Sequence, residues 1–224
     1  MSVETIRLYV SIPVASFRVP RAREYFETFP VPPPATVYGM LLSMCGEVNR
    51  RTHEGAEIAI ALLSEPSYSV VLRTMWRVKK KENGLGLGEN RRPDFQELLT
   101  GVQLAVWVRT GPTERADVPL ASRVRTALAT PDQVHRFGGL SLGESTHLVD
   151  EIKEIGDRVI KGRLLMAQDE GDLSLPIWPD HVGSNTRWGQ YRLSDEADIT
   201  NEVLDNESAW TVIRRPLLAP LSSN

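Results

Sequence analysis

Cations and glycines are concentrated in one short part of the chain, residues 73–92. This stretch, RTMWRVKKKENGLGLGENRR, holds seven basic and two acidic residues, a local charge of +5, and three glycines. Lys and Arg neutralise phosphates, and glycine lets a main chain approach a ligand closely. An aromatic ring beside such cations, here Trp76, could stack on a base. The pattern predicts a basic loop that orders on a phosphate backbone. The alternative, a solvated loop whose lysines keep a hairpin soluble, stays open.

A second basic cluster lies in SFRVPRAREYF and consists of Arg18, Arg21 and Arg23. It directly follows a predicted strand, and side chains at strand ends are well placed to meet ligands. Aromatic residues alternate with these cations, as they do in many nucleic-acid-binding surfaces. The alternative is local ion pairing with Glu24 and Glu27. Taken alone, this cluster favours neither interpretation.

The segment FGGLSLGES, residues 137–145, matches the nucleophile pattern G-x-S-x-G at Ser141. That pattern needs a strand before the serine and a helix after it. Pro131 leaves little room for the strand, and no helical apolar stripe follows Gly143. Asp150 and His181 stand in the order a hydrolase requires, but such residues are common. We therefore favour a glycine loop whose amides meet a phosphate or a backbone, with a plain tight turn as the alternative.

The remaining residues that bind metals or act as nucleophiles form no motif. The four histidines show no HxH, HxxH or HxxxH spacing, so no metal site and no cofactor are expected. The single cysteine, Cys45, excludes an internal disulfide or a cysteine zinc site. We expect it to be an inert small hydrophobe. The histidines are His53, His135, His147 and His181.

Composition is that of a globular protein: 224 residues, 41% hydrophobic and 25% charged, with net charge −3. Residues 1–110 hold 14 basic and 11 acidic side chains, whereas residues 111–224 hold 12 and 18. The average charge therefore says nothing against a polyanionic partner that meets only one surface. No apolar run is long enough to span a bilayer, and the first residues do not look like a signal peptide. A cytoplasmic protein without membrane contact is expected.

Hydrophobic periodicity predicts the elements that must position these clusters. Alternating Ile6, Leu8, Val10 and Ile12 indicate a strand, and residues 37–44 an amphipathic helix with Thr36 as its N-cap and Gly46 at its end. Later segments predict strands at 57–63, 68–78, 102–109, 159–167, 173–177 and 210–215, and a helix from Pro119 to Leu128. The order indicates an α+β fold with helices on one face of a sheet. The acidic segments 144–157 and 195–207 are interpreted as solvated surface.

The order of these features is more specific than any one of them. A strand leads into ASFRVP, then FPVPPPATVYGMLLSMCGE, then the basic loop and NRRPDFQELLTGVQLAVWV, and finally FGGLSLGES. Over roughly residues 5–145 this resembles the Cas5 family of CRISPR-associated proteins, most specifically in PPPATVYGML. The overall sequence pattern is similar to that of the variants found in type I-B-like systems.

The resemblance implies a ferredoxin-like (RRM-like) antiparallel sheet with helices on one face and a protruding β-hairpin thumb. The body would be residues 1–145, with the thumb at about 70–109. A smaller β-rich part, residues 146–224, would pack on it. The resemblance also implies the role of a CRISPR Cascade subunit that caps the 5′ handle of the guide RNA (crRNA), in antiviral defence or RNA-guided transposition. The thumb would meet the adjacent backbone subunit and another face the large subunit, with target DNA reached only through the complex.

Carried onto this chain, the resemblance implies RNA contacts at the two cation clusters, at Trp76 and at the glycine segment. Tyr38 is expected to pack against the sheet instead. The residues concerned are Arg18, Arg21, Arg23, Arg73, Trp76, Arg77, Lys79, Lys80, Lys81, Arg91, Arg92, Phe137, Gly138, Gly139, Ser141 and Gly143.

One branch of the family, in type I-C systems, cuts crRNA itself with a tyrosine, a lysine and an adjacent histidine. This chain has no Lys-His pair, and His135-Arg136 is the nearest substitute. Cleavage by general acid–base catalysis needs a titratable group at the scissile phosphate. We therefore expect a protein that is not an enzyme, with a metal-independent endoribonuclease as the alternative.

Overall fold

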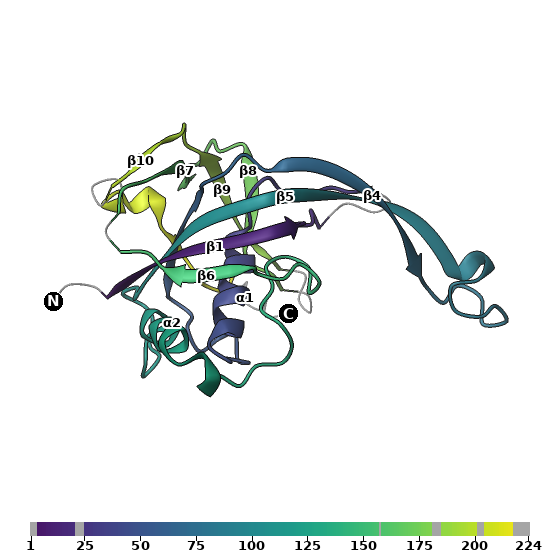
Figure 1. Ribbon diagram of the computed structural model, residues 1–224, viewed down its shortest axis with the longest axis horizontal. Coiled ribbons are helices and arrows are strands. Elements are labelled where there is room, and N and C mark those ends of the chain that lie inside the picture. Colours follow the sequence, from purple (N-terminus) through teal and green to yellow (C-terminus); the bar gives the residue numbers. More distant parts are fainter. Residues whose placement is uncertain (1–3, 21–24, 157, 181–184, 201–203, 217–224) are drawn as a thin grey trace, which may run out of the picture.

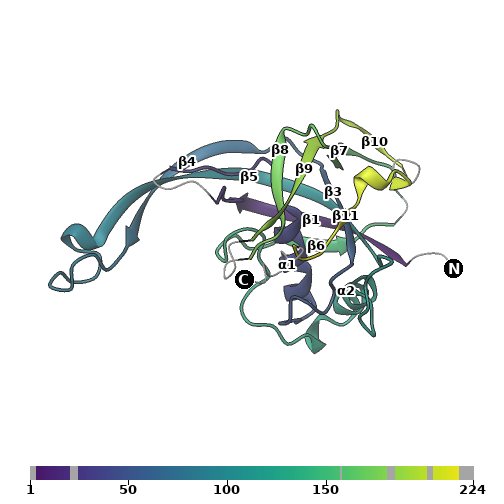
Figure 2. The same cartoon turned by 180° about the vertical axis from the view of Figure 1, so that it is seen from behind.

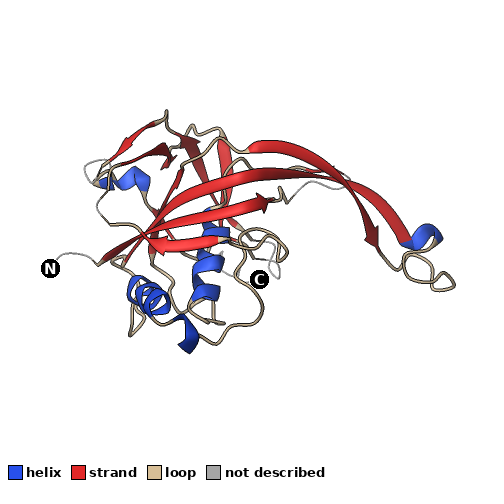
Figure 3. Ribbon diagram, viewed as in Figure 1, coloured by secondary structure: helices blue, strands red, loops and turns tan. Residues whose placement is uncertain are grey.

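The computed structural model describes residues 4–20, 25–156, 158–180, 185–200 and 204–216. Figure 1 shows a body built around a sheet, from which one two-stranded ribbon projects far to the side. Figure 2 shows the same projection from behind, and Figure 3 shows that the helices are few and short.

The helices are α1 (Pro34–Met44) and α2 (Leu120–Ala129), with short 3-10 turns at Gly88–Asn90, Pro131–Gln133 and Glu207–Ala209. The strands are β1 (Thr5–Ala15), β2 (Tyr25–Phe26), β3 (Glu57–Leu62), β4 (Ser67–Trp76), β5 (Arg91–Arg109), β6 (Glu151–Glu154), β7 (Ile160–Ala167), β8 (Leu173–Trp178), β9 (Arg187–Leu193), β10 (Ala197–Ile199) and β11 (Thr211–Val212).

Four strands form the centre of the sheet in the order β6-β1-β5-β3, and each is antiparallel to its neighbours. Helix α1 connects β1 to β3, and α2 lies between β5 and β6 along the chain. Beyond β3 the sheet continues through β7, β9 and β8. The prediction of a mainly antiparallel sheet accompanied by two helices is confirmed.

The sheet is buried on both faces. The side chains of β1 that the alternation pattern selects, such as Leu8 and Val10, are fully buried with Leu41 of α1 and Val124 of α2. The opposite face carries Trp107 and alanines of β3 and β5 under the β7 region. Burying a side chain of this size contributes about 1.5–3 kcal/mol, so the helices and the β7 region together hold the sheet rigid.

Several boundaries differ from the predictions. Helix α1 begins at Pro34 and not after Thr36, since proline's fixed φ suits the first helical turn and its missing N–H has no partner there. The predicted strand 102–109 is only the second half of β5, which runs unbroken from Arg91. The predicted solvated stretch 144–157 contains the edge strand β6, whose charged side chains protect the sheet edge from further pairing.

The ribbon in Figure 1 consists of β4 and the first half of β5, in register from Ser67 opposite Thr100 to Trp76 opposite Arg91. We call residues 67–100 the projecting hairpin and its connection, residues 77–90, the tip. Residues directly opposite each other in an antiparallel pair share a face. One face therefore carries Trp76 and Leu72, and the other carries Arg73.

Candidate nucleic-acid interface

The tip folds around one buried side chain, Asn90. Its Oδ1 accepts hydrogen bonds from the backbone amides of Lys79 and Lys80, at 2.7 and 2.8 Å. Its Nδ2 donates to the carbonyl oxygens of Lys80 and Asn83, at 2.8 and 2.7 Å. Gly86, with φ +71°, packs against the Trp76 indole, where a Cβ would come within 2.8 Å of the ring. This role of Asn90 has no signal in the sequence, because asparagine is common in any loop.

The seven cations of the hairpin differ in how they are paired. Lys79 and Lys80 both bind Glu89, at 2.8 and 2.5 Å, and these two ammonium groups lower the pKa of Glu89. Arg92 pairs with the buried Asp94, at 2.8 Å. In the described part of the chain no ion pair involves Arg77, Lys81 or Arg91, but Arg77 Nε donates to the carbonyl oxygen of Glu89 at 3.1 Å. Lys81 and Arg91 are therefore the exposed cations most available to phosphates.

Arg73 of β4, which lies opposite Asp94, connects the projecting hairpin to the glycine segment. Its Nη1 lies 2.8 Å from Glu144 Oε2 and also donates to Gln96 Oε1. Gln96 Nε2 in turn donates to Glu144 Oε1, at 2.8 Å. Glu144 lies in the stretch interpreted as solvated surface, and this contact corrects that interpretation. Two clusters far apart in sequence thus meet at one end of the sheet.

The glycine loop, residues 137–147, packs against the end of β1. A Cβ on Gly143, which has φ +99°, would lie 2.6 Å from the carbonyl oxygen of Ser16. Phe137 and Gly138 at the other side of the loop are exposed, and nothing lies within 4 Å of a Cβ built on Gly138. One end of the loop is therefore fixed to the body, while the other end presents an aromatic ring and bare backbone to the outside.

The serine of this loop is not placed as a nucleophile. Ser141 forms an isolated antiparallel bridge with Leu148, and Leu142 N donates to the carbonyl oxygen of His147 at 3.1 Å. The chain thus turns back as a small hairpin after Gly143 instead of entering a helix. His181 lies outside the described residues. The nucleophile geometry that G-x-S-x-G requires is not formed here.

His147 belongs to this site, although no motif in the chain singled it out. Its Nδ1 accepts a hydrogen bond from the backbone amide of Ser16, at 3.2 Å. Burial lowers its pKa, the nearby charge of Glu144 raises it and that of Arg73 lowers it again. The ring is therefore neutral at pH 7, with its proton on Nε2.

This arrangement predicts a pH-dependent stability. The pKa of His147 is lower in the folded chain than its ordinary value of 6.5, so the unfolded chain binds the proton first. The neutral His147 ring therefore contributes to the stability of the fold above pH 6.5, and this contribution is lost as the pH falls below that value. We expect the free energy of unfolding to fall by up to about 1.4 kcal/mol per pH unit there. Thermal melts of the wild type and of His147→Asn, whose Oδ1 can accept the same hydrogen bond, check this. An equal pH dependence in both would contradict it.

The structure describes only Arg18 of the three arginines that follow β1. The Arg18 guanidinium lies 3.9 Å from the centre of the Phe26 ring, and Arg18 forms an isolated bridge with Thr28. Arg21 and Arg23 lie outside the described residues. Tyr38 is fully buried, as expected, and donates a hydrogen bond to the carbonyl oxygen of Arg50 at 2.7 Å.

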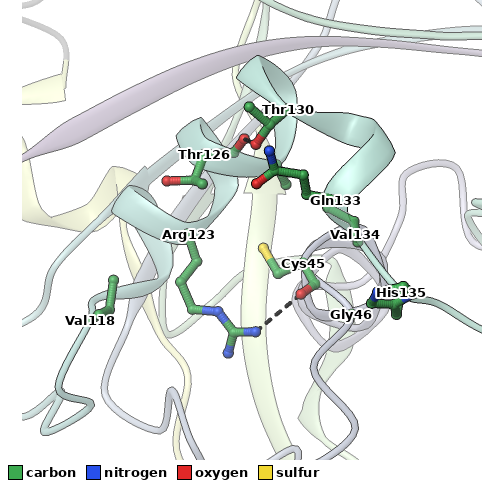
Figure 4. Close-up of a pocket in the computed structure, with 10 residues that line it drawn as sticks. Cys45, Gly46, Val118, Arg123, Thr126, Thr130, Gln133, Val134 and His135 are labelled. Atoms are coloured by element: carbon green, nitrogen blue, oxygen red, sulfur yellow. Dashed lines mark hydrogen bonds between the residues drawn. The ribbon is translucent and has the colours of Figure 1, made fainter.

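A cavity of about 590 Å³ lies between the C-terminal end of α1 and α2 (Figure 4). Arg123 Nη2 donates to the carbonyl oxygen of Cys45 at 3.0 Å, and burial raises the pKa of the Cys45 thiol to about 11. A thiol of that pKa is not a nucleophile at neutral pH.

Across the described ranges, no three His, Cys, Asp or Glu side chains come together to hold a metal ion. Nor does a described helix have the length and apolar character needed to cross a membrane.

Comparison with solved structures shows which other proteins share this fold. The structure resembles a chain of a "CRISPR RNA-guided surveillance complex", with TM-score 0.58 and 14% identity over 88% of this chain and 91% of that one. It also aligns with a "Crystal structure of Cas protein" at TM-score 0.49 and 15% identity, over 88% of this chain and 96% of that one. The fold is thus one found in CRISPR surveillance complexes. No protein-family model matches the sequence.

The family follows from sequence identity. The chain is 42% identical over 193 residues to the "CRISPR-associated protein Cas5" of Myxococcus xanthus (strain DK1622), an alignment that covers 85% of this chain and 90% of that protein. The chain belongs to the Cas5 family of CRISPR-associated proteins, as the resemblance in PPPATVYGML and the glycine segment predicted.

Proposed function

We propose that this protein is a non-catalytic, crRNA-binding subunit of a type I Cascade complex. It caps the 5′ handle of the guide RNA and joins the backbone subunits to the large subunit, in antiviral defence or RNA-guided transposition. It works in the cytoplasm and reaches target DNA only through the complex. The observation that carries the proposal is the Arg73–Glu144 contact, which joins the cationic hairpin and the glycine loop into one surface.

The finer fold assignment belongs to this proposal. The chain order β1-α1-β3-β5-α2-β6 with sheet order β6-β1-β5-β3 is that of a ferredoxin-like, RRM-like body. The projecting hairpin is then the thumb, inserted between the second and third strands of this body. In this assignment the sequence from β7 onward is a β-rich extension that continues the sheet beyond β3.

RNA binding is supported by the side chains of β4 and β5 next to the tip. Trp76 is 69% exposed and lies directly opposite Arg91, so an aromatic ring shares one face with a cation that has no ion pair among the described residues. Stacking of one base on an aromatic side chain is worth about 1–3 kcal/mol. The exposed Phe137 offers a second ring at the glycine loop.

Protein binding is supported by the part of the same hairpin face that lies nearer the body. Leu72 is 63% exposed, and Tyr68, Val70 and Phe95 beside it are also exposed. A row of exposed apolar side chains on a monomer marks an interaction site. We assign it to the adjacent backbone subunit, because the hairpin extends away from the body.

We expect Leu72→Asp to weaken incorporation of this subunit into the complex at least tenfold, since the carboxylate would be buried against an apolar partner at a cost of about 2 kcal/mol or more. Co-expression with the other subunits and a repeat array, followed by purification through a tag on the backbone subunit, measures this. Val159→Asp is the matched control, because Val159 is equally exposed but lies away from the hairpin. Equal incorporation of both variants would contradict the assignment.

The alternative function, a metal-independent endoribonuclease, gains one specific observation. The neutral imidazole of His147 lies within the electrostatic influence of Arg73 at the proposed RNA surface. To accept the proton of a 2′-hydroxyl, the ring would have to give up the hydrogen bond that its Nδ1 accepts from the Ser16 amide. Loss of a specific cut of repeat RNA in His147→Asn, with RNA binding retained, would favour this function over the first.

A further inference from the structure

A polar cavity of about 740 Å³ lies on the C-terminal part of the chain, away from the hairpin. It is formed by β9, the end of β7 and the segment around β11. Two arginines, Arg187 and Arg214, line it, together with Gln168, Gln190 and one acidic residue, Asp169. These arginines stand out because residues 111–224 as a whole carry six more acidic than basic side chains.

The two arginines lack the partners that surface arginines usually have. Arg187 Nε is buried without a hydrogen-bond partner, and its Nη1 is 3.5 Å from the carbonyl oxygen of Arg215. Within the described residues no carboxylate pairs with Arg187 or Arg214. In contrast, the neighbouring Arg215 binds Glu54 at 2.8 Å. A buried donor without a partner costs about 1–3 kcal/mol, so an acceptor that reached Arg187 Nε would remove that cost.

An indole ring extends the cavity toward the end of β1. Trp188 of β9 is 41% exposed and lines the arginine cavity. It also lines a second, smaller cavity of about 360 Å³ with Val19 and Pro20, which follow Arg18 in the chain. Arginine, amide and aromatic groups together are the groups that bind phosphates and stack on bases. An acidic peptide would use the arginines but would have no need of the ring.

We propose that this arginine cavity binds phosphodiester groups of a single-stranded nucleic acid, with one base stacked on Trp188. The site goes beyond the handle-capping role, because it lies on β9 and not on the hairpin or the glycine loop. Neighbouring residues of a β-strand point to opposite faces, so the nucleic acid passes Arg18 and Trp188 on one face of β9 and crosses the end of this strand to place its phosphates at Arg187 and Arg214. RNA and DNA share this chemistry, so the experiment below compares them.

The test is photo-crosslinking of the full chain to short oligonucleotides that carry 5-iodouridine or 5-iodo-deoxyuridine, with adducts located by peptide mass spectrometry. We expect an adduct at Trp188 with at least one of the two. It should fall about tenfold in the double variant Arg187→Gln with Arg214→Gln, because each lost phosphate contact weakens binding and lowers the salt dependence. Arg192→Gln, on the same strand but outside the cavity, should leave it unchanged. The single variant Arg214→Gln, at an exposed side chain, replaces the double variant if that one fails to fold.

An adduct with only one oligonucleotide assigns the site to RNA or to DNA. Absence of a Trp188 adduct with both, or an adduct equally strong in the variants, would overturn the proposal. So would tight binding of a labelled polyglutamate peptide that requires the same arginines, since the partner would then be a protein. Adducts at Trp76 report the hairpin separately, so failure of the handle-capping role and failure of this site are distinguishable.

Discussion

Replacing Lys81 and Arg91 together by glutamate is expected to weaken binding of repeat-derived RNA about a hundredfold. Neither has an ion pair or a side-chain hydrogen bond in the described chain, whereas Arg77 donates to the carbonyl oxygen of Glu89, and Lys79 and Lys80 are held by the Glu89 carboxylate. Two charged contacts at about 1.5 kcal/mol each amount to about 3 kcal/mol, which corresponds to about a hundredfold in Kd. Fluorescence anisotropy with labelled repeat RNA at several salt concentrations measures the change, and the salt slope should drop by about 1.4.

The matched control carries the same change in charge elsewhere. Lys153→Glu with Lys161→Glu alters two exposed lysines on β6 and β7, away from the hairpin. We expect less than about a threefold effect on Kd from this pair, since neither lysine lies at the proposed phosphate contacts. If both double variants weakened binding equally, the effect would be one of net charge, and the assignment of the hairpin tip as the RNA contact would be wrong.

Gly143→Val is expected to dislodge the glycine loop. Its φ of +99° is strained for a β-branched residue, and the new Cβ would lie 2.6 Å from the carbonyl oxygen of Ser16, a backbone atom that cannot move aside. Strain and clash together should cost more than about 2 kcal/mol. The hydrogen bond from Ser16 to His147 and the Arg73–Glu144 pair would be disturbed as well. We expect a clear fall in melting temperature and in RNA affinity.

Gly138→Ala provides the control. Gly138 also has a positive φ, +77°, but a Cβ at this position would have no atom within 4 Å, so only the backbone strain of about 1 kcal/mol remains. A melting temperature of Gly143→Val equal to that of Gly138→Ala would show that the contact between the loop and β1 carries no stability.

Elements with a buried apolar face were predictable, and the hairpin shows why others were not. The alternation in β1 and the helix after Pro119 correspond to the structure within a residue or two. The first half of β5 showed no such pattern, because the buried side chains on one of its faces are Asp94 and Gln96, which bind Arg92 and Arg73. A polar buried face leaves no hydrophobic period for the sequence to display.

The site was predictable in its parts but not in its assembly. The cation cluster and the glycine segment were visible as compositions, since both depart from the surrounding sequence. Their contact through Arg73 and Glu144, and the placement of His147 at Ser16, depend on the path of the whole sheet. The pairing of Lys79 and Lys80 with Glu89 likewise changes which cations are available, and it emerges only once the tip has folded.

The most direct measurement of the central proposal is a binding experiment with purified protein and 5′-labelled repeat RNA in EDTA, analysed on native and denaturing gels in parallel. We predict a shifted complex that contains intact RNA, that prefers the handle over an unrelated RNA of equal length, and that is lost when Lys81 and Arg91 are replaced by glutamate. A specific cut on the denaturing gel, or equal binding of unrelated RNA, would contradict the account of a non-catalytic subunit that caps the crRNA handle.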